Sequence, residues 1–169
     1  MYFNIGHDGK LSTGIDLAEA LRVGYPQDVV REAMRAEAMK QVDKEHAHFM
    51  RTLTGGATIE ERDTWASKAA AAKAYLADSA TEEQKMLIEL EAAGDGTPPR
   101  DLAARITAKA VAFHRLIGMA SAMKRRGRVA LDQAAAEGGP IEDVEASIEN
   151  ALDLISAEFA AAMRSGEAR

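Results

Sequence analysis

The sequence predicts an all-α fold of about five helices, two of them long with coiled-coil-like seams, after a short irregular or β-hairpin N-terminus. Apolar residues after residue 15 recur at the spacings of three and four that are typical of helices. Glycine and proline divide this part of the chain into segments of helical length. Because alanine is abundant and aromatic residues make up only 5% of the chain, each helix buries little apolar area. We therefore expect side-by-side helices that self-associate into a homo-oligomer.

Residues 1–14 differ from the rest of the chain. A short β-prone run, Tyr2 to Ile5, precedes Gly6 and the turn-forming pair Asp8-Gly9. We expect a strand and a turn, or a small hairpin, over residues 1–14. The remaining residues, 15–169, are expected to form a single helical domain.

The next signals set the bounds of two helices. Asp16 is suited to cap a short helix that continues to Arg22. Pro26 occurs where a first-turn proline is tolerated, so a second helix is expected from there to about Leu53. The glycines at 55 and 56 are expected to end it.

Two capping-box spacings follow in the middle of the chain. Thr58 and Glu61 have the spacing in which two side chains satisfy each other's backbone N–H groups at a helix start. Ser79 and Glu82 repeat this spacing before another apolar run. Gly94 is expected to end that second helix in a left-handed conformation.

The longest expected helix begins at Thr97-Pro98 and could reach Glu137, where Gly138-Gly139-Pro140 breaks the pattern. An apolar stripe with alternating steps of four and three predicts a coiled-coil seam: Ile106, Ala110, Phe113, Ile117, Ala120, Lys124, Gly127, Leu131 and Ala134. A second stripe predicts the final helix: Ile141, Val144, Ile148, Ala151, Leu152, Ile155 and Phe159. An extended helical hairpin over 98–164 is therefore expected, with weaker packing at Lys124 and Gly127.

Charge is strongly divided between these two segments. Residues 100–128 carry a net charge of +7 and end in the cluster Lys124, Arg125, Arg126 and Arg128, whereas residues 129–163 carry −8. A charge match within the chain or between copies is the favoured interpretation, and an acidic partner protein or a nucleic acid remains an alternative. Nucleic acid is disfavoured for two reasons. Only two aromatic rings that could stack on bases, Phe113 and His114, lie near the cluster in the sequence, and the attached acidic helix would compete with phosphates for the same cations.

The search for catalytic chemistry favours a non-enzymatic protein without a cofactor or metal. The chain has no cysteine, and it lacks a glycine-rich phosphate loop and a nucleophile elbow. Glu45 and His48 have the Glu-x-x-His spacing of helical di-iron sites, but a second such pair is absent. We also find neither a signal peptide nor a long apolar run, so a cytoplasmic protein of the host cell without membrane partners is expected.

Trp65 is the single tryptophan, and it shares a helical stripe with Ala69, Ala72 and Leu76. Core packing is the ordinary interpretation, and a partner-binding anchor is the alternative because interface hot spots favour tryptophan. The partner-binding candidates share an apolar stripe or the basic cluster: Trp65, Phe113, Ile117, Lys124, Arg125, Arg126, Arg128 and Leu131.

The segment from Thr64 to Ala136 resembles the alanine-rich helical part of bacteriophage and prophage tail-fibre and tail-assembly proteins. The similar phrases are "AKAYLAD" after Trp65, then "RDLAARITAKAVAFHRLIG", and an Arg/Lys run before "ALDQA". This resemblance implies a tail-associated protein that binds a tail or fibre protein through its helices and assists assembly, possessing no catalytic motif. It also allows a virion-associated, structural subunit of the particle, and a nucleic-acid-associated helical protein is the further alternative.

Overall fold

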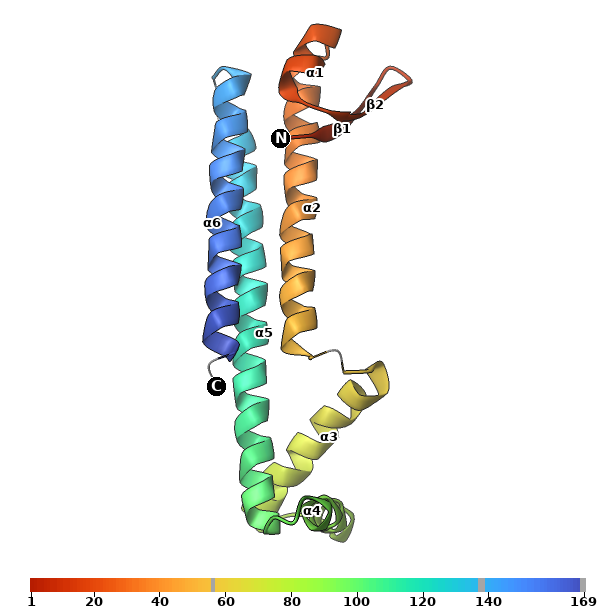
Figure 1. Ribbon diagram of the computed structural model, residues 1–169, viewed down its shortest axis with the longest axis vertical. Helices are drawn as coiled ribbons and strands as arrows, with labels where there is room; N and C mark the ends of the chain where they lie inside the picture. Colours follow the sequence, from red (N-terminus) through yellow and green to blue (C-terminus); the bar gives the residue numbers. More distant parts are fainter. Residues whose placement is uncertain (56, 137–138, 168–169) are drawn as a thin grey trace. The chain divides into compact units, whose positions relative to one another are not determined.

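A computed structural model describes residues 1–55, 57–136 and 139–167. Within these residues the chain forms a two-stranded hairpin and six helices (Figure 1): β1 Phe3–His7, β2 Lys10–Ile15, α1 Leu17–Val23, α2 Gln27–Leu53, α3 Ile59–Leu76, α4 Glu82–Asp95, α5 Pro99–Ala136 and α6 Ile141–Glu167. The helical class and the hairpin are confirmed. The described residues form six helices, slightly more than the expected count of about five. As expected, α1 is separate from α2, since Gly24, with φ of 85°, ends α1 before Pro26. Three helices, not two, have 27 residues or more within the described residues.

The described residues group into two compact units. Unit 1 comprises Met1–Thr52 and Met119–Arg169, and unit 2 comprises Leu53–Gly118. Helix α5 contributes its first half to unit 2 and its second half to unit 1. The single helical domain expected over residues 15–169 stays a prediction, and each unit is described by itself below.

The hairpin of unit 1 is antiparallel and closes at Asp8 and Gly9, both with positive φ, 49° and 75°. Such a two-residue turn matches the right-handed twist of the strands. Phe3 and Ile5 point to one face and are 1% and 2% exposed. They anchor the hairpin in the apolar core, which confirms the expected N-terminal hairpin.

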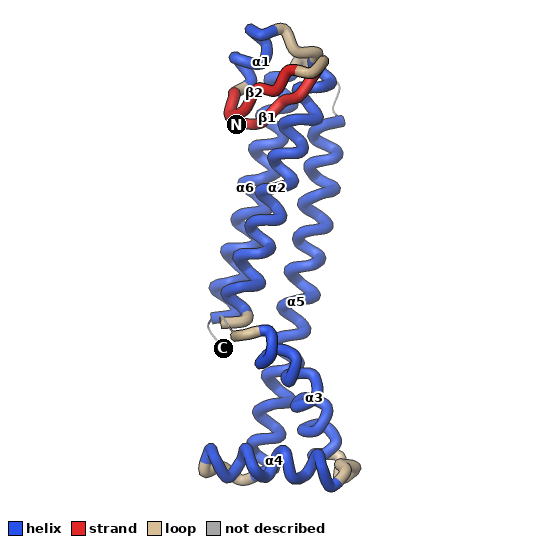
Figure 2. The backbone as a smooth tube through the Cα atoms, turned by 90° about the vertical axis from the view of Figure 1, so that its right-hand side faces the viewer, coloured by secondary structure: helices blue, strands red, loops and turns tan. Residues whose placement is uncertain are grey.

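Helices α2 and α6 and the second half of α5 lie side by side in unit 1 (Figures 1 and 2). Their buried side chains recur at helical spacing and include Val30, Met34, Val42, Phe49, Met123, Leu131, Ile141, Val144, Ile148 and Phe159. The rings of Phe49 and Phe159 lie 6.0 Å apart across α2 and α6. Burial of these stripes holds the bundle together, since each large apolar side chain contributes about 1.5–3 kcal/mol.

Gly127 of α5 packs directly against the side chain of Ile155 on α6. A Cβ built on it would lie 2.9 Å from Ile155 Cδ1 and 3.1 Å from Ile155 Cγ1. We expected packing to weaken at this position of the seam. The structure shows the opposite, because the missing side chain lets Ile155 fill the space above the α5 backbone.

Unit 2 consists of α3, α4 and the first half of α5. The capping box at Thr58 and Glu61 is confirmed. The second box is formed by Thr81 and Gln84 rather than by Ser79 and Glu82, and the helix ends at the left-handed Gly96 rather than at Gly94. Thr81 is preferred because it lies directly before the first helical residue, where its hydroxyl can reach the Gln84 N–H.

The core of unit 2 is made of small side chains. Ala71, Ala72, Ile88 and Ala103 form its buried cluster, with Tyr75, Leu76, Leu87 and Ile106 packed against it while partly exposed. The long helix α5 begins at Pro99, close to the expected start, and Glu137 and Gly138 of the expected break lie outside the described residues. Among the helices that the structure describes, none is both long and apolar enough to cross a membrane.

Candidate functional site

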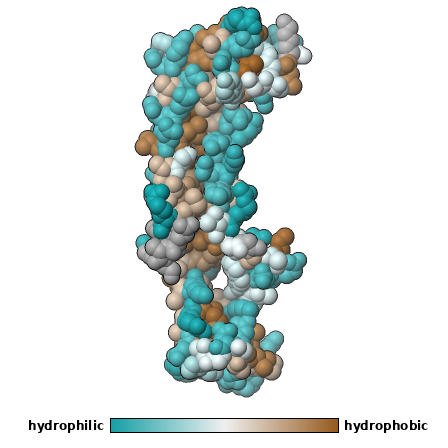
Figure 3. All heavy atoms as spheres, in the orientation of Figure 1, coloured by the Kyte–Doolittle hydropathy of each residue, from teal (hydrophilic) through white to brown (hydrophobic). Residues whose placement is uncertain are grey.

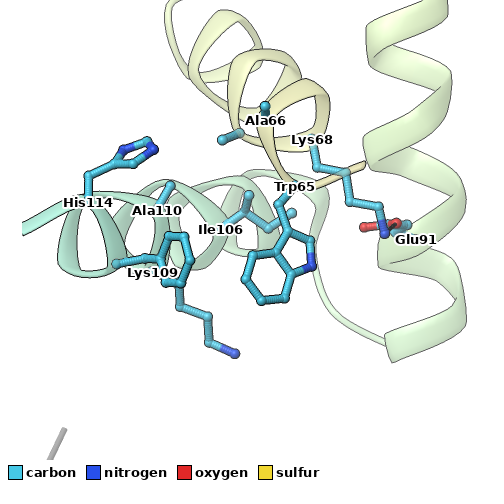
Figure 4. A pocket seen from close by; sticks show the side chains of 10 residues that line it. Trp65, Ala66, Lys68, Glu91, Ile106, Lys109, Ala110 and His114 are labelled. Atoms are coloured by element: carbon cyan, nitrogen blue, oxygen red, sulfur yellow. Dashed lines mark ion pairs between the residues drawn. The ribbon is translucent and has the colours of Figure 1, made fainter. Parts of the chain in front are cut away.

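The strongest candidate site is an apolar pocket in unit 2 between α3 and α5. Its volume is about 410 Å³, and the residues that line it include Trp65, Ala66, Ala69, Ile106, Lys109, Ala110, Phe113 and His114 (Figure 4). Helical spacing places them there: Trp65 and Ala69 are one turn apart on α3, and Ile106, Ala110 and Phe113 follow the same stripe of α5. On the face shown in Figure 3, apolar atoms of unit 2 reach the surface between hydrophilic ones.

Trp65 and Phe113 form the aromatic wall of this pocket. Their ring centroids lie 5.1 Å apart with an angle of 85° between the planes, an edge-to-face arrangement. Both side chains are only half-buried. The structure therefore brings together two of the residues that the sequence singled out and leaves part of each ring exposed.

Two lysines, Lys68 and Lys109, lie at the rim of the pocket. Lys68 pairs with Glu91, so its charge is neutralised. Lys109, by contrast, is exposed and has no ion pair or hydrogen bond within the part of the chain that the structure describes, and its ammonium extends away from the other labelled side chains in Figure 4. The indole N–H of Trp65 likewise has no acceptor among the described residues. Both groups can therefore donate hydrogen bonds to oxygen acceptors outside the described residues.

The basic cluster of α5 belongs to unit 1 and is largely engaged there. Lys124 Nζ lies 3.0 Å and Arg128 Nη2 lies 2.8 Å from Asp43 Oδ1 on α2. Arg126 Nη2 lies 2.8 Å from Glu158 Oε2 on α6. The charge match expected between the basic and acidic segments is thus met at Arg126, whereas Lys124 and Arg128 pair with α2 instead.

Asp43 shows the effect of this arrangement in its titration. The hydrogen bond from Lys124, followed by that from Arg128, lowers the pKa of the Asp43 carboxyl below its ordinary value. On the next turn of α2, burial lowers the pKa of His46, and the nearby Lys124 charge lowers it further. The His46 ring packs edge-on against Phe159, 6.4 Å between centroids.

The remaining candidates lie apart from the pocket. Leu131 is 0% exposed and is part of the unit 1 core, so its surface is covered within the chain itself. Ile117 is half-buried in α5 and does not line the pocket. Arg125 is exposed and has no ion pair or hydrogen bond to any residue that the structure describes.

Sequence reasoning missed the roles of Lys109 and Asp43. Lys109 is three residues after Ile106 and four before Phe113, so the same stripe could have placed it at the pocket rim. Asp43 offered no such signal, because its partners are more than eighty residues away in the sequence. The described residues contain no group of three or more His, Asp or Glu side chains that could hold a metal ion.

The geometry of the pocket suits the binding of an apolar group. Its wall is aromatic and aliphatic, and its single neutralised ion pair, Lys68 with Glu91, lies at one side. Apolar pockets with a few polar groups at the rim are typical of recognition sites. Comparisons with known protein families, with curated proteins and with solved structures find no family and no protein similar to this chain.

Proposed function

We propose that this protein is a non-enzymatic, helix-mediated protein-binding factor that assists the assembly of a phage or prophage tail or tail fibre. The observation that carries the binding part is the open aromatic pocket of unit 2, where Trp65 and Phe113 remain half-exposed. The assignment to tails rests on the sequence resemblance over Thr64 to Ala136.

The physical mechanism is insertion of an apolar segment of the partner between α3 and α5. Aromatic walls offer a large contact area, and removal of a tryptophan anchor from an interface typically costs about 2 kcal/mol or more. The pocket lacks a fully apolar rim, so polar groups such as Lys109 select the partner's orientation. A tail protein with uncovered apolar surface would be held soluble in this way until assembly.

The test is capture of the tagged full chain from its own host during phage or prophage induction, with mass spectrometry of the captured proteins. We expect the wild type to capture a tail or fibre protein. The variants Trp65→Ala and Phe113→Ala should fail to capture it, because the affinity of each for that protein should fall roughly thirtyfold. Tyr2→Ala is the matched control, because Tyr2 is an aromatic residue of unit 1 that is 70% exposed.

Purified particles decide between the alternatives. Absence of the chain from particles, together with a captured tail protein, supports an assembly factor, whereas its presence there would make it a structural subunit. Captured partners that disappear after nuclease treatment would instead favour nucleic-acid binding. That outcome is disfavoured because Asp43 and Glu158 already neutralise much of the basic cluster.

A further inference from the structure

The outer face of α4 is a second apolar surface of unit 2. Ile88 and Ala92 point into the core, 0% and 1% exposed. On the opposite side, Met86 and Leu90 are 57% and 66% exposed and lie one helical turn apart. This i, i+4 pair is the pattern with which an amphipathic helix anchors in a groove.

Carboxylates border this apolar pair on both sides. At 100° per residue, Glu82 and Glu89 lie along one border of the stripe and Glu83 along the other. Glu83 and Glu89 have no ion pair or hydrogen bond with any residue in the described ranges. The rim of the pocket, by contrast, carries the cation Lys109, which has no ion pair within the described residues. The two surfaces are therefore complementary in charge as well as in apolar character.

We propose that the pocket lined by Trp65 and Phe113 binds α4 of a second copy of this chain, with Met86 and Leu90 as the anchors. A methionine thioether makes favourable contacts with aromatic rings. The bordering glutamates supply the acceptors that Lys109 and the Trp65 indole N–H lack. This inference rests on the proposed function, because it assigns an occupant to the same binding pocket.

Both surfaces belong to unit 2, so the contact can be reciprocal. In a two-fold dimer each copy inserts its α4 into the pocket of the other, and the interface closes without forming a filament. The second copy covers the exposed aromatic rings until a partner with the same chemistry displaces it.

The first experiment measures self-association of the purified full chain by sedimentation and by the emission of Trp65, the single tryptophan. We expect dimers, and a blue shift of the emission as concentration rises because the indole becomes buried. Leu90→Gln should weaken dimerisation at least tenfold. Leu154→Gln is the matched control, since Leu154 is a leucine of unit 1 that is 70% exposed. This change should alter the dissociation constant of the dimer by no more than about twofold.

Charge exchange tests the pairing of the two surfaces. Lys109→Glu and Glu83→Lys should each weaken homodimers, because each places like charges at both contacts. A mixture of the two variants should form heterodimers with an affinity near that of the wild type, because every contact then joins opposite charges. Failure of the mixture to associate while both variants remain folded by circular dichroism would overturn the proposal.

Cross-linking locates the contact directly, because the chain has no cysteine of its own. A chain with Ala66→Cys mixed with a chain with Leu90→Cys should form a disulfide-linked heterodimer, and Val129→Cys in place of Leu90→Cys should not. A monomer at every concentration, or equal cross-linking of the control, would contradict the inference. Loss of dimers with retained capture of a tail protein would remove this inference alone, whereas intact dimers without a captured partner would remove the proposed function alone.

Discussion

The two units bury side chains of very different size. Unit 1 holds ten of the eleven largest fully buried side chains among the described residues, among them Phe3, Met34 and Phe159, whereas unit 2 holds Ile88. In unit 2 the aromatic side chains Trp65 and Phe113 remain half-exposed at the pocket instead. The difference teaches that one unit buries its largest apolar groups in its own core, while the other builds its core from small side chains and leaves its two largest rings partly exposed.

The largest expected effect tests the core of unit 1. Phe159→Ala should lower the free energy of unfolding by about 3–5 kcal/mol, because it leaves a cavity between α2 and α6. Urea unfolding followed by far-ultraviolet circular dichroism measures this loss, while Trp65 emission follows unit 2. We expect the dichroism transition to shift more than the emission transition. Equal shifts of both transitions would mean that the two units unfold together, so that their stabilities could not be compared separately.

The next effect compares two glycines of α5. Gly127→Ala should destabilise the protein by about 1–2 kcal/mol, because the clash with Ile155 outweighs the gain in helix propensity. Gly118→Ala is the matched control: a Cβ there meets nothing within 4 Å, so we expect stabilisation of about 0.5–1 kcal/mol. Thermal unfolding of both variants measures whether each change raises or lowers the stability relative to the wild type. A stabilising Gly127→Ala would show that the helices do not need the close approach.

The smallest effect concerns the ion pairs at Asp43. Its pKa is lowered in the folded protein, so its stabilising contribution is complete above the unfolded pKa of about 3.9 and is lost as the pH falls through the folded pKa. Asp43→Asn should therefore cost about 0.5–1 kcal/mol at pH 7, a modest value because the side chain is 45% exposed. The difference from the wild type should vanish at low pH in urea titrations. Asp153→Asn, a change at an exposed carboxylate of α6, is the matched control.

Local signals in the sequence predicted most of the fold. The Asp8-Gly9 turn, the cap at Thr58 and the stripe through Ile148 and Phe159 depend on neighbours within a few residues, so their structures could be derived from spacing. Charge pairing could not be derived in this way. Opposite net charges on two adjacent helices predicted that these helices would neutralise each other. Asp43 on a third helix, however, forms ion pairs with two of the four basic residues of the cluster, Lys124 and Arg128.

The pocket was half predictable for the same reason. Trp65 and Phe113 were both identified as candidates, but their meeting depends on how α3 packs on α5, which no local spacing encodes. Leu131 shared the stripe of Phe113 and was chosen with it, although the structure buries it completely. A stripe predicts which face is apolar, and the number of neighbours around that face decides whether it is core or binding surface.

The alanine-rich core of unit 2 also has a thermodynamic consequence. Unfolding such a core exposes little apolar area, so its heat capacity change is small and its intrinsic stability is limited. A partner present at about 100 times its dissociation constant adds about 2.7 kcal/mol to the folded state. This is close to what a large-to-small change in a core removes, about 2–5 kcal/mol. If the proposed partner binds in the pocket, its binding should therefore raise the protein's resistance to proteolysis, and a copy without the partner should be degraded first.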